Sequence, residues 1–537
     1  MPSLSKFLER FPLYPFLAAL YPVLYLVSVN ISETTPLAGL RSALLFLALA
    51  LLAFMFFLAC TRSVQRSALY TLAVVLVFFL IFFVLYAPVY TTLREVKLAG
   101  HVLGRHRYLV PASALLVGVT AVLLLIFGRR IPRKVLNGLS AFLNVAALVL
   151  TLLPVITIVS ATIKEKNAVA ESSAALPAVT TLAAIEQQPD IYYIILDMDT
   201  SENAMVQLMN YDDSAFTHAL EERGFFVSTC SRSNYDSTKQ SLTSSLNMDY
   251  LQDLDVSGGM DGLYPLVQQS RVRRLLEGAG YETWAFKTGY SYLDLKDAAH
   301  YSDPTSGALN LLTYPGITNF ESLILSISAG QVLYENRDGL SKQMQTFIDA
   351  PYMQRREEIF NIMDSLPQAA ADESASPKFV YAHILAPHDP FVFDETGEPA
   401  FRRFPFTQNK DPEFGAGYGW DEYKKAYVNE VIYLHGAVIE MIDQILANSQ
   451  IPPVIILQGD HGIPWSKPYS AQFEILNAYY FPGVSEPGYY DGISPVNSFR
   501  LLFNDYFDAA YPLLPDESYV TGEDFTFTLF TETFTCP

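Results

Sequence analysis

The stretch IYYIILDMDTS (191–201) decides the fold of the second part of this chain. Its first six residues are apolar or aromatic without a break, which is typical of a strand buried on both faces of a parallel sheet. Similar runs recur along the chain, separated by amphipathic stretches. The runs are TWAF (283–286), FVYAHIL (379–385), VIILQ (454–458) and NAYYF (477–481), and the predicted helices cover 265–279, 336–364, 421–448 and 494–506. This alternation predicts an α/β sandwich with a mostly parallel sheet.

Carboxylates and imidazoles follow three of these strands. They are Asp197 and Asp199 after the first strand, His383 and His388 in HILAPHDP (383–390), and Asp460 and His461 in QGDHG (458–462). Each motif alone is also explained by a capping Asp or a hydrogen-bonded His at a strand end. Ligands of open parallel sheets bind at the carboxyl ends of strands, so together the motifs indicate one site. Asp with Asp-His is a ligand set suited to Mn²⁺ or Zn²⁺.

Hydroxyl side chains precede a predicted amphipathic helix in SNYDSTKQSLTSSLNM (233–248). Ser and Thr before a helix are usually N-caps. A hydroxyl near a helix N-terminus also benefits from oriented N–H groups, which favour an incoming phosphate. The sequence therefore allows two roles for these hydroxyls, as a helix cap or as a nucleophile.

Residues 1–163 predict an all-α membrane part with five transmembrane helices. Each of five apolar stretches is long enough to cross a hydrocarbon core, which needs about 20 helical residues. The stretches are 12–31, 38–60, 69–90, 108–128 and 137–161. Residues 164–189, with Ala, Ser, Thr and Pro and no strand or core-helix pattern, predict a linker. Residues 190–537 then form the α/β domain.

Charge separates these parts. Residues 1–188 carry 15 Lys and Arg against 6 Asp and Glu, a net charge of +9, whereas the rest of the chain carries −29. An acidic domain repels phosphates, which argues against a nucleic-acid partner. Basic residues near the first, second and fourth apolar stretches favour an N-terminus inside the cell, although those after the third oppose it. Five crossings then place the domain from Asp190 outside the cytoplasm.

The chain has three cysteines, Cys60, Cys230 and Cys536, and no two have the spacing of zinc ligands. A bridge between Cys230 and Cys536 requires an oxidising compartment. The sequence leaves a bridge and two unpaired thiols equally open.

These motifs resemble the alkaline phosphatase superfamily, and in particular its membrane-anchored sulfatase-like branch, which includes lipoteichoic acid synthases and phosphoethanolamine transferases. The likeness extends from about residue 190 to about residue 520, with the motifs in that family's order. They are IYYIILD, SNYDSTKQSLTSSLNM, HILAPHDPFVFD, QGDHG, LNAYYFPG and SPVNSFRLLFNDYF. Five helices followed by an extracytoplasmic catalytic domain is also the architecture of that branch.

The resemblance implies roles for single residues. Asp197 matches the metal ligand after the first strand, Asp460 and His461 match the Asp-His metal pair, and Thr238 matches the threonine that binds the metal and becomes covalently modified. Ser237 is the fallback nucleophile. His388 and His383 fall where the family binds the substrate phosphate or protonates the leaving group. One divalent metal ion, Mn²⁺ or Zn²⁺, is the implied cofactor.

The implied activity is phosphotransfer in the plasma or inner membrane. A phospholipid donor passes its phospho-head group, through a phospho-threonine, to a glycan or glycolipid acceptor of the cell envelope. Met198 and Asp199 stand where close relatives often carry Gly-Tyr, so Asp199 is either an extra ligand or a sign of an altered site. A formylglycine sulfatase needs a C/S-x-P-x-R motif, which this sequence lacks, so sulfate-ester hydrolysis is disfavoured. The first alternative is a metal-dependent phosphodiesterase or phosphatase, or another sulfatase-like hydrolase. The second is a non-catalytic envelope assembly protein.

Overall fold

The computed structural model describes most of the chain, and the chain divides into two compact units. The described residues are 11–31, 34–93, 96–98, 101–175, 182, 188–254, 256, 258–304, 314–374, 376–401, 403–408, 419–464, 469–522 and 524–532. The first unit comprises Met1–Lys164, Gly307–Pro351 and Arg402–Gln408. The second comprises Glu165–Ser306, Tyr352–Phe401 and Asn409–Pro537.

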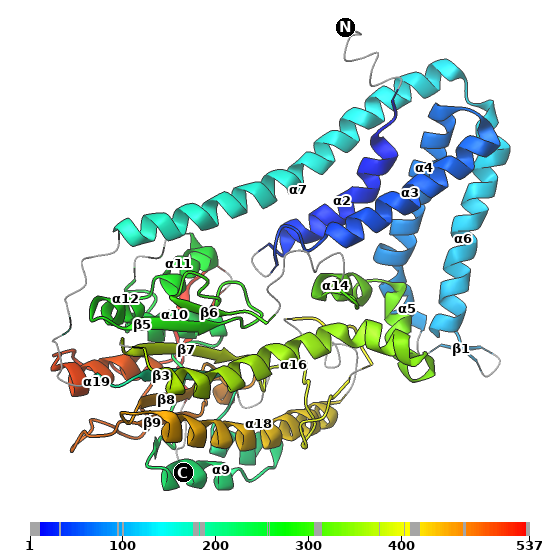
Figure 1. Cartoon of the computed structure of the whole chain (residues 1–537). Coiled ribbons are helices and arrows are strands. Elements are labelled where there is room, and N and C mark those ends of the chain that lie inside the picture. Colours follow the sequence, from blue (N-terminus) through cyan, green and yellow to red (C-terminus); the bar gives the residue numbers. More distant parts are fainter. Residues whose placement is uncertain are drawn as a thin grey trace. The chain divides into compact units, whose positions relative to one another are not determined.

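Apolar helices make up most of the first unit (Figure 1). They are α2 (Tyr14–Val29), α3 (Leu40–Thr61), α4 (Val64–Phe79), η1 (Leu80–Leu85), α5 (Tyr86–Leu93), α6 (His106–Phe127), η2 (Gly128–Arg130) and α7 (Arg133–Ala175), with a hairpin of β1 (Lys97–Leu98) and β2 (His101–Val102). Many of their large apolar side chains are exposed, as expected of surfaces that face lipid.

Four of the five predicted crossings are long enough to span a membrane. Among the described residues, Leu40–Thr61, Val64–Leu85, His106–Arg130 and Arg133–Lys164 have the necessary length and hydropathy. The predicted first span is a helix of 16 residues, shorter than the others, because the chain turns at Asn30. A fifth crossing therefore stays a prediction.

The predicted linker begins as a helix. Helix α7 continues to Ala175, because the sequence from Lys164 onward contains good helix formers and no proline before Pro177. Most of the remaining linker lies outside the described residues.

A segment predicted to belong to the α/β domain packs with the apolar helices of the first unit. Its elements are α14 (Asn319–Ser326), η5 (Ala329–Gln331), α15 (Val332–Glu335), η6 (Arg337–Gly339) and the start of α16 (Lys342–Ala371). Phe320 is buried against Val23 and Val27 of α2. Nε of Arg41 lies 3.2 Å from Oε1 of Glu321. These contacts explain why residues 307–351 interrupt the domain that was expected to run unbroken over 190–537.

A sheet of seven strands, counted over the described residues, forms the centre of the second unit. The strands are β3 (Ile191–Leu196), β4 (Phe226–Val227), β5 (Glu282–Phe286), β6 (His300–Ser302), β7 (Lys378–Ile384), β8 (Val454–Gly459) and β9 (Asn477–Tyr480). Their order is β4-β9-β8-β3-β7-β5-β6. The five strands from β8 to β6 are parallel, and β9 and β4 are antiparallel to their neighbours. The prediction of a mostly parallel sheet is confirmed.

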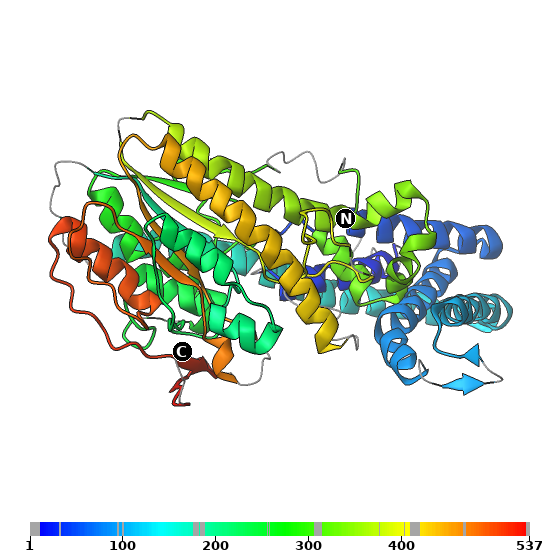
Figure 2. The same ribbon diagram turned by 90° about the horizontal axis from the view of Figure 1, so that it is seen from below.

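Helices cover both faces of this sheet (Figures 1 and 2). They are α8 (Glu202–Ala204), η3 (Met205–Met209), α9 (Ser214–Glu222), α10 (Thr238–Asn247), η4 (Gly259–Gly262), α11 (Leu263–Gln268), α12 (Arg271–Gly278), α18 (Trp420–Asn448), η7 (Tyr469–Gln472) and α19 (Pro495–Phe507), followed by a hairpin of β10 (Tyr519–Thr521) and β11 (Phe527–Leu529). One core joins alternate strand residues such as Tyr193 to α10, α11, α12 and α19. Helix α18 and the second half of α16 run side by side, gold and yellow-green in Figure 2.

Two predicted helices differ from those observed. The helix predicted over 265–279 is two helices, because Ser270 accepts a hydrogen bond from the backbone N–H of Arg273 and starts α12 anew. The helix predicted over 336–364 begins later, at Lys342, because Arg337–Gly339 forms a 3₁₀ turn first.

Candidate active site

Asp197 and Asp460 leave the sheet next to each other because β3 and β8 are neighbouring parallel strands. Leu196 at the end of β3 pairs in register with Gly459 at the end of β8. The backbone N–H of Asp197 donates to the carbonyl of Ile384 at the end of β7, 2.9 Å away. Three adjacent strands therefore end together at the edge where open parallel sheets bind ligands.

The side chains of Asp197, Asp460 and His461 form a compact buried cluster. One potential ligand atom from each residue lies within 4.8 Å of the others. Nε2 of His461 lies 3.9 Å from Oδ1 of Asp197 and 3.7 Å from Oδ2 of Asp460. The structure thus brings the three predicted metal ligands together.

Hydrogen bonds orient the members of this cluster. The N–H of Met198 donates to Oδ1 of Asp460 at 2.9 Å. Met198 has a φ of 67°, a left-handed conformation that costs an L-residue roughly 1–2 kcal/mol. The hydroxyl of Tyr427 donates a hydrogen bond to the carbonyl of Met198 at 2.9 Å. Nδ1 of His461 donates to the carbonyl of Gly462 at 2.8 Å, so Nε2 of His461 presents a lone pair to the cluster.

The cluster has the chemistry that a divalent cation needs. Both carboxylate oxygens of Asp197 and Oδ2 of Asp460 are buried, and within the described part of the chain they have no hydrogen-bond partner. Uncompensated buried carboxylates are costly, and a cation between them removes that cost. Two carboxylates with one imidazole nitrogen suit Zn²⁺ or Mn²⁺. The residues present therefore fit such an ion.

The electrostatics of the two aspartates differ. Burial, and then the facing Asp460 charge, raise the pKa of the Asp197 carboxyl well above its usual range. Burial opposes ionisation of Asp460 as well, but the charges of His461 and His383 and the Met198 N–H outweigh it, so the pKa of Asp460 lies below its usual range.

Thr238 places its hydroxyl beside the cluster. It is the first residue of α10, it is buried, and its Oγ1 lies 3.2 Å from Nε2 of His461. Ser237 precedes the helix, makes no capping bond with its side chain, and donates its hydroxyl to the side-chain carbonyl of Gln240. The structure therefore brings Thr238, and not Ser237, into contact with the predicted metal ligands.

The two predicted substrate-binding histidines occupy different places. His383 is fully buried on β7, with Nε2 3.4 Å from Oδ2 of Asp197, and burial lowers its pKa to about 4. His388 lies beyond the end of β7, and 14% of its side chain is exposed. Its Nδ1 donates to the carbonyl of Asp389 at 2.6 Å. The structure therefore places His383 beside the cluster and His388 at the more exposed end of β7.

Asp199 is not part of the cluster. Its Oδ2 lies 2.9 Å from Nε2 of His435 on α18. The sequence left Asp199 open as an extra metal ligand, and the structure instead pairs it with a histidine that no sequence motif had singled out.

Arg355 is a site residue that sequence reasoning missed. It is 2% exposed on α16, and its Nη1 donates to the carbonyl of Leu385 at 3.1 Å. Its charge opposes the rise in the pKa of Asp197. A single arginine within a helix forms no sequence pattern that would connect it with Asp197, which is far away in the sequence.

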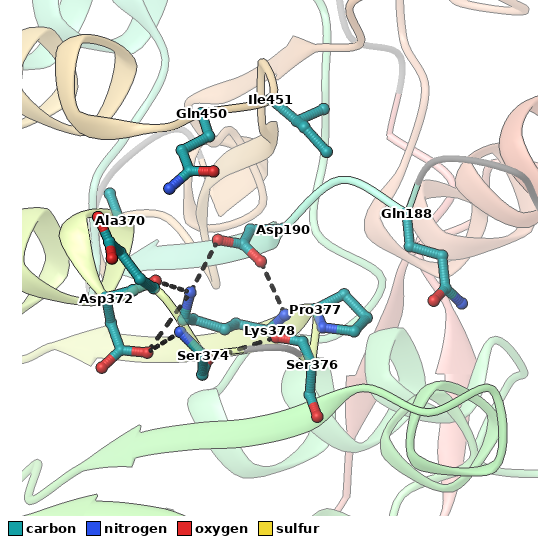
Figure 3. Close-up of a pocket in the computed structure, with 11 residues that line it drawn as sticks. Gln188, Asp190, Ala370, Asp372, Ser374, Ser376, Pro377, Lys378, Gln450 and Ile451 are labelled. Atoms are coloured by element: carbon teal, nitrogen blue, oxygen red, sulfur yellow. Dashed lines mark hydrogen bonds and ion pairs between the residues drawn. The ribbon is translucent and has the colours of Figure 1, made fainter.

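A separate cavity lies at the opposite, amino-terminal edge of the sheet (Figure 3). It has a volume of about 320 Å³ and is lined by polar residues that include Asp190, Asp372 and Lys378. Nζ of Lys378 donates to the Asp372 carbonyl at 2.7 Å and lies 3.5 Å from Oδ2 of Asp190. The charge of Lys378 is thus compensated, and none of the predicted site residues lines this cavity.

The cysteines are in different states. Cys230 is disulfide-bonded, and Cys60 is a free, exposed thiol. Cys536, the partner considered for Cys230, lies outside the described residues.

Comparison with known proteins gives a family match. A model described as sulfatase matches residues 192–491, which is more than half of the chain and spans the cluster. No curated protein matches the chain.

Solved structures that the chain is similar to include two phosphoethanolamine transferases and a sulfatase. The integral membrane lipooligosaccharide phosphoethanolamine transferase A (EptA) from Neisseria meningitidis is 13% identical, with 93% of this chain and 95% of that chain covered and a TM-score of 0.38. The C-terminal periplasmic domain of EptC from Escherichia coli in complex with Zn is also 13% identical, with 62% and 87% covered and a TM-score of 0.38. A 2-O GAG sulfatase is 12% identical, with 61% and 72% covered and a TM-score of 0.36. These similarities are too distant to assign an activity to this chain.

Proposed function

The chain belongs to the sulfatase family, and from that premise we propose that it is a membrane-bound, metal-dependent phosphotransferase with Thr238 as its nucleophile. One observation carries the proposal. The Thr238 hydroxyl lies 3.2 Å from a histidine that also faces three buried carboxylate oxygens, both of Asp197 and Oδ2 of Asp460, which have no hydrogen-bond partner among the described residues. A nucleophile beside an unsatisfied anionic cluster is the arrangement that metal-assisted group transfer requires.

In this proposal Asp197, Asp460, His461 and Thr238 hold one divalent ion, Mn²⁺ or Zn²⁺. Such an ion, when bound, lowers the pKa of the threonine hydroxyl and neutralises charge on the phosphoryl oxygens. His383 lies beside the site on β7, with Nε2 3.4 Å from Oδ2 of Asp197. Arg355 adds a buried positive charge near the same carboxylate.

The reaction proceeds in two steps with Thr238 restored at the end. In the first step Oγ1 of Thr238, as the alkoxide that remains once its hydroxyl proton has passed to solvent, forms a bond to the phosphorus of a phospholipid head group, and the bond from phosphorus to the lipid oxygen breaks. His388 gives a proton to the departing oxygen, which leaves as neutral lipid. In the second step the oxygen of an acceptor hydroxyl forms a bond to the phosphorus and gives its proton to His388. The bond from phosphorus to Oγ1 breaks, so the acceptor takes the head group and Thr238 returns to the alkoxide of the first step.

The residue type at position 238 favours phosphate over sulfate esters. A formylglycine is made from Cys or Ser, and Thr238 stands at the nucleophile position without the C/S-x-P-x-R context. Its alkoxide attacks phosphorus directly and needs no such modification.

The apolar helices of the first unit support a lipid as the donor of the head group. A catalytic unit on the same chain as apolar spans meets bilayer lipids at high effective concentration. We place the site outside the cytoplasm of the plasma or inner membrane, where glycans or glycolipids of the envelope supply the acceptor. The domain limits in this proposal remain 1–163, 164–189 and 190–537 along the sequence. Phe320 and Glu321, from within the third range, contact the apolar helices of the first unit.

The test is an analysis of lipid products. The purified full chain, loaded with Mn²⁺ or Zn²⁺, is incubated with glycerophospholipid vesicles, and diacylglycerol is measured. The proposal predicts diacylglycerol from the wild-type chain and none above background from Thr238→Ala. Added sugar acceptors separate the two enzymatic alternatives, since a transferase yields a head-group-modified sugar and a hydrolase yields free head-group phosphate. A purified chain that binds no metal and releases no diacylglycerol even with Mn²⁺ or Zn²⁺ added would favour the non-catalytic alternative.

A further inference from the structure

Lys239 follows the proposed nucleophile directly on α10, and an aromatic ring holds its ammonium group. Nζ of Lys239 lies 4.4 Å from the centroid of the Tyr292 ring. Such a cation–π contact fixes a lysine on one side and leaves its N–H donors available on the other. No carboxylate of the described residues forms an ion pair with Lys239, so its charge is not neutralised by the chain there.

The loop that presents Tyr292 is built rigidly. The backbone N–H and the hydroxyl of Thr288 donate to Oδ1 of Asp294 at 2.9 and 3.0 Å. Gly289 has a φ of 100°, which a side chain rarely permits. Nε2 of Gln268 donates to the Tyr292 carbonyl at 2.9 Å. Tyr292 itself is buried in the core of the second unit, so its ring is a fixed support for Lys239.

The same loop connects Lys239 to the proposed proton donor. The rings of Tyr290 and Tyr292 stack at 5.4 Å, and the Tyr290 ring meets the His388 ring edge-on at 6.3 Å. Two tyrosines after β5 thus lie between the residue next to Thr238 and His388. Thr238 contacts His461 of the metal-ligand cluster, and the neighbouring Lys239 contacts the aromatic pair.

We propose that Lys239 is the anion-binding residue of this site and contacts a phosphoryl oxygen of the ligand. The proposal rests on the proposed function, and it deepens it by naming the group that recognises the negative charge. The ammonium, supported by Tyr292, donates a charge-assisted hydrogen bond to a non-bridging oxygen while Oγ1 of Thr238 faces the phosphorus. The ligand is either the phosphodiester of a lipid head group or free inorganic phosphate, which share this oxygen chemistry.

Phosphate binding tests the inference without turnover. Inorganic phosphate is titrated into the metal-loaded full chain in detergent, and its Kd is measured by calorimetry. Lys239→Gln should weaken binding roughly ten- to hundredfold, as expected for a lost hydrogen bond to a charged group. Lys239→Arg should retain part of the affinity. Lys425→Gln makes the same charge change at an exposed position of α18 and should leave the Kd unchanged.

A double-mutant cycle separates anion binding from a structural role. Tyr292→Leu removes the supporting ring, whereas Tyr292→Phe keeps it. Tyr292→Leu should weaken phosphate binding in the wild-type background and add little in the Lys239→Gln background, because both changes disturb the same contact. Bound metal per chain should stay the same in every variant, since none of them touches the ligand cluster.

A second arm distinguishes the sources of the anion. If Lys239→Gln also raises KM for glycerophospholipid in mixed micelles, the lipid phosphodiester is the ligand, and if KM is unchanged, the ligand is free phosphate. If no protein turns over lipid, the proposed function fails while the phosphate titration still decides the role of Lys239. Unchanged phosphate affinity in Lys239→Gln, or no phosphate binding by the wild-type chain, overturns the inference.

Discussion

Nε2 of His435 lies 2.9 Å from Oδ2 of Asp199, and Nδ1 of the same ring lies 3.0 Å from Oδ2 of Asp213. The ring also stacks on Phe216 at 3.7 Å. Burial opposes the charge on His435, but the two carboxylates outweigh it and raise the pKa of His435 to about 10. Burial raises the pKa of Asp199 too, and we nevertheless assign the charged pair because one imidazolium faces two carboxylates at hydrogen-bond distance. This arrangement ties α9 and α18 to the turn that carries Asp197.

Asp199→Asn should lower stability and spare metal binding. The change leaves His435 with one carboxylate, and breaking a buried ion pair costs roughly 3–5 kcal/mol. The thermal unfolding midpoint of the full chain in detergent should therefore fall, while bound metal per folded chain, measured by elemental analysis, stays at the wild-type value. Loss of metal with an unchanged midpoint would show that Asp199 is a ligand after all.

The stability of the second unit should depend on pH through His435. Its pKa rises from an ordinary value of about 6.5 to about 10 in the folded chain. The stabilisation is therefore complete below about pH 6.5 and is lost as pH rises through about 10. The difference in unfolding midpoint between the wild-type chain and His435→Gln should shrink from pH 7 to pH 10. A difference of constant size would mean that His435 is not the titrating group.

Asp460→Asn should abolish metal binding with little change in shape. The amide keeps the volume of the side chain but removes a charge from the buried cluster. Losing a ligand should reduce metal affinity by more than the roughly 10–100-fold typical of an outer-shell partner. Asp443→Asn, an exposed aspartate paired with Arg223, is the matched control and should bind metal normally. Stoichiometric metal in Asp460→Asn would refute the ligand assignment.

Cys60 offers a test of the membrane topology. It is a free, exposed thiol at the end of α3, followed closely by Arg62 and Arg66, and basic residues favour the cytoplasmic face. A membrane-impermeant maleimide applied to intact cells should label the wild-type chain no more than Cys60→Ser. After permeabilisation the wild-type chain should gain label and Cys60→Ser should not. Labelling of Cys60 in sealed cells contradicts an extracytoplasmic catalytic unit.

The sequence predicted those parts of the fold that local pattern controls. The run Ile191–Leu196 is a strand with the expected bounds, because an uninterrupted apolar run of that length matches a strand buried on both faces. The break at Ser270 was missed, because a capping serine inside an amphipathic stretch does not disturb the apolar pattern. The place of residues 307–351 was missed as well, because contacts such as Phe320 with Val23 join segments far apart in the chain.

In the candidate site, too, the sequence predicted the residues that follow local patterns and missed those placed by contacts between distant segments. Asp197, Asp460 and His461 were expected together because each follows a strand of one parallel sheet, and strand order brings such ends to one edge. Arg355 and His435 were not expected, because they lie within long helices and reach the site only through the packing of those helices on the sheet. Tyr292 belongs to the same group, since its contact with Lys239 depends on the course of a loop.

The covalent role of Thr238 is the central claim, and the mass of the protein after contact with lipid tests it most directly. The metal-loaded full chain is incubated with glycerophospholipid vesicles, quenched in acid and measured as intact protein, and the modified residue is then located in peptides. A head-group phosphate adduct on Thr238 is predicted in the wild-type chain and in the matched control Thr243→Ala, which changes another buried threonine of α10. No adduct is predicted in Thr238→Ala. An adduct on Ser237, or diacylglycerol release by Thr238→Ala at the wild-type rate, would contradict the account.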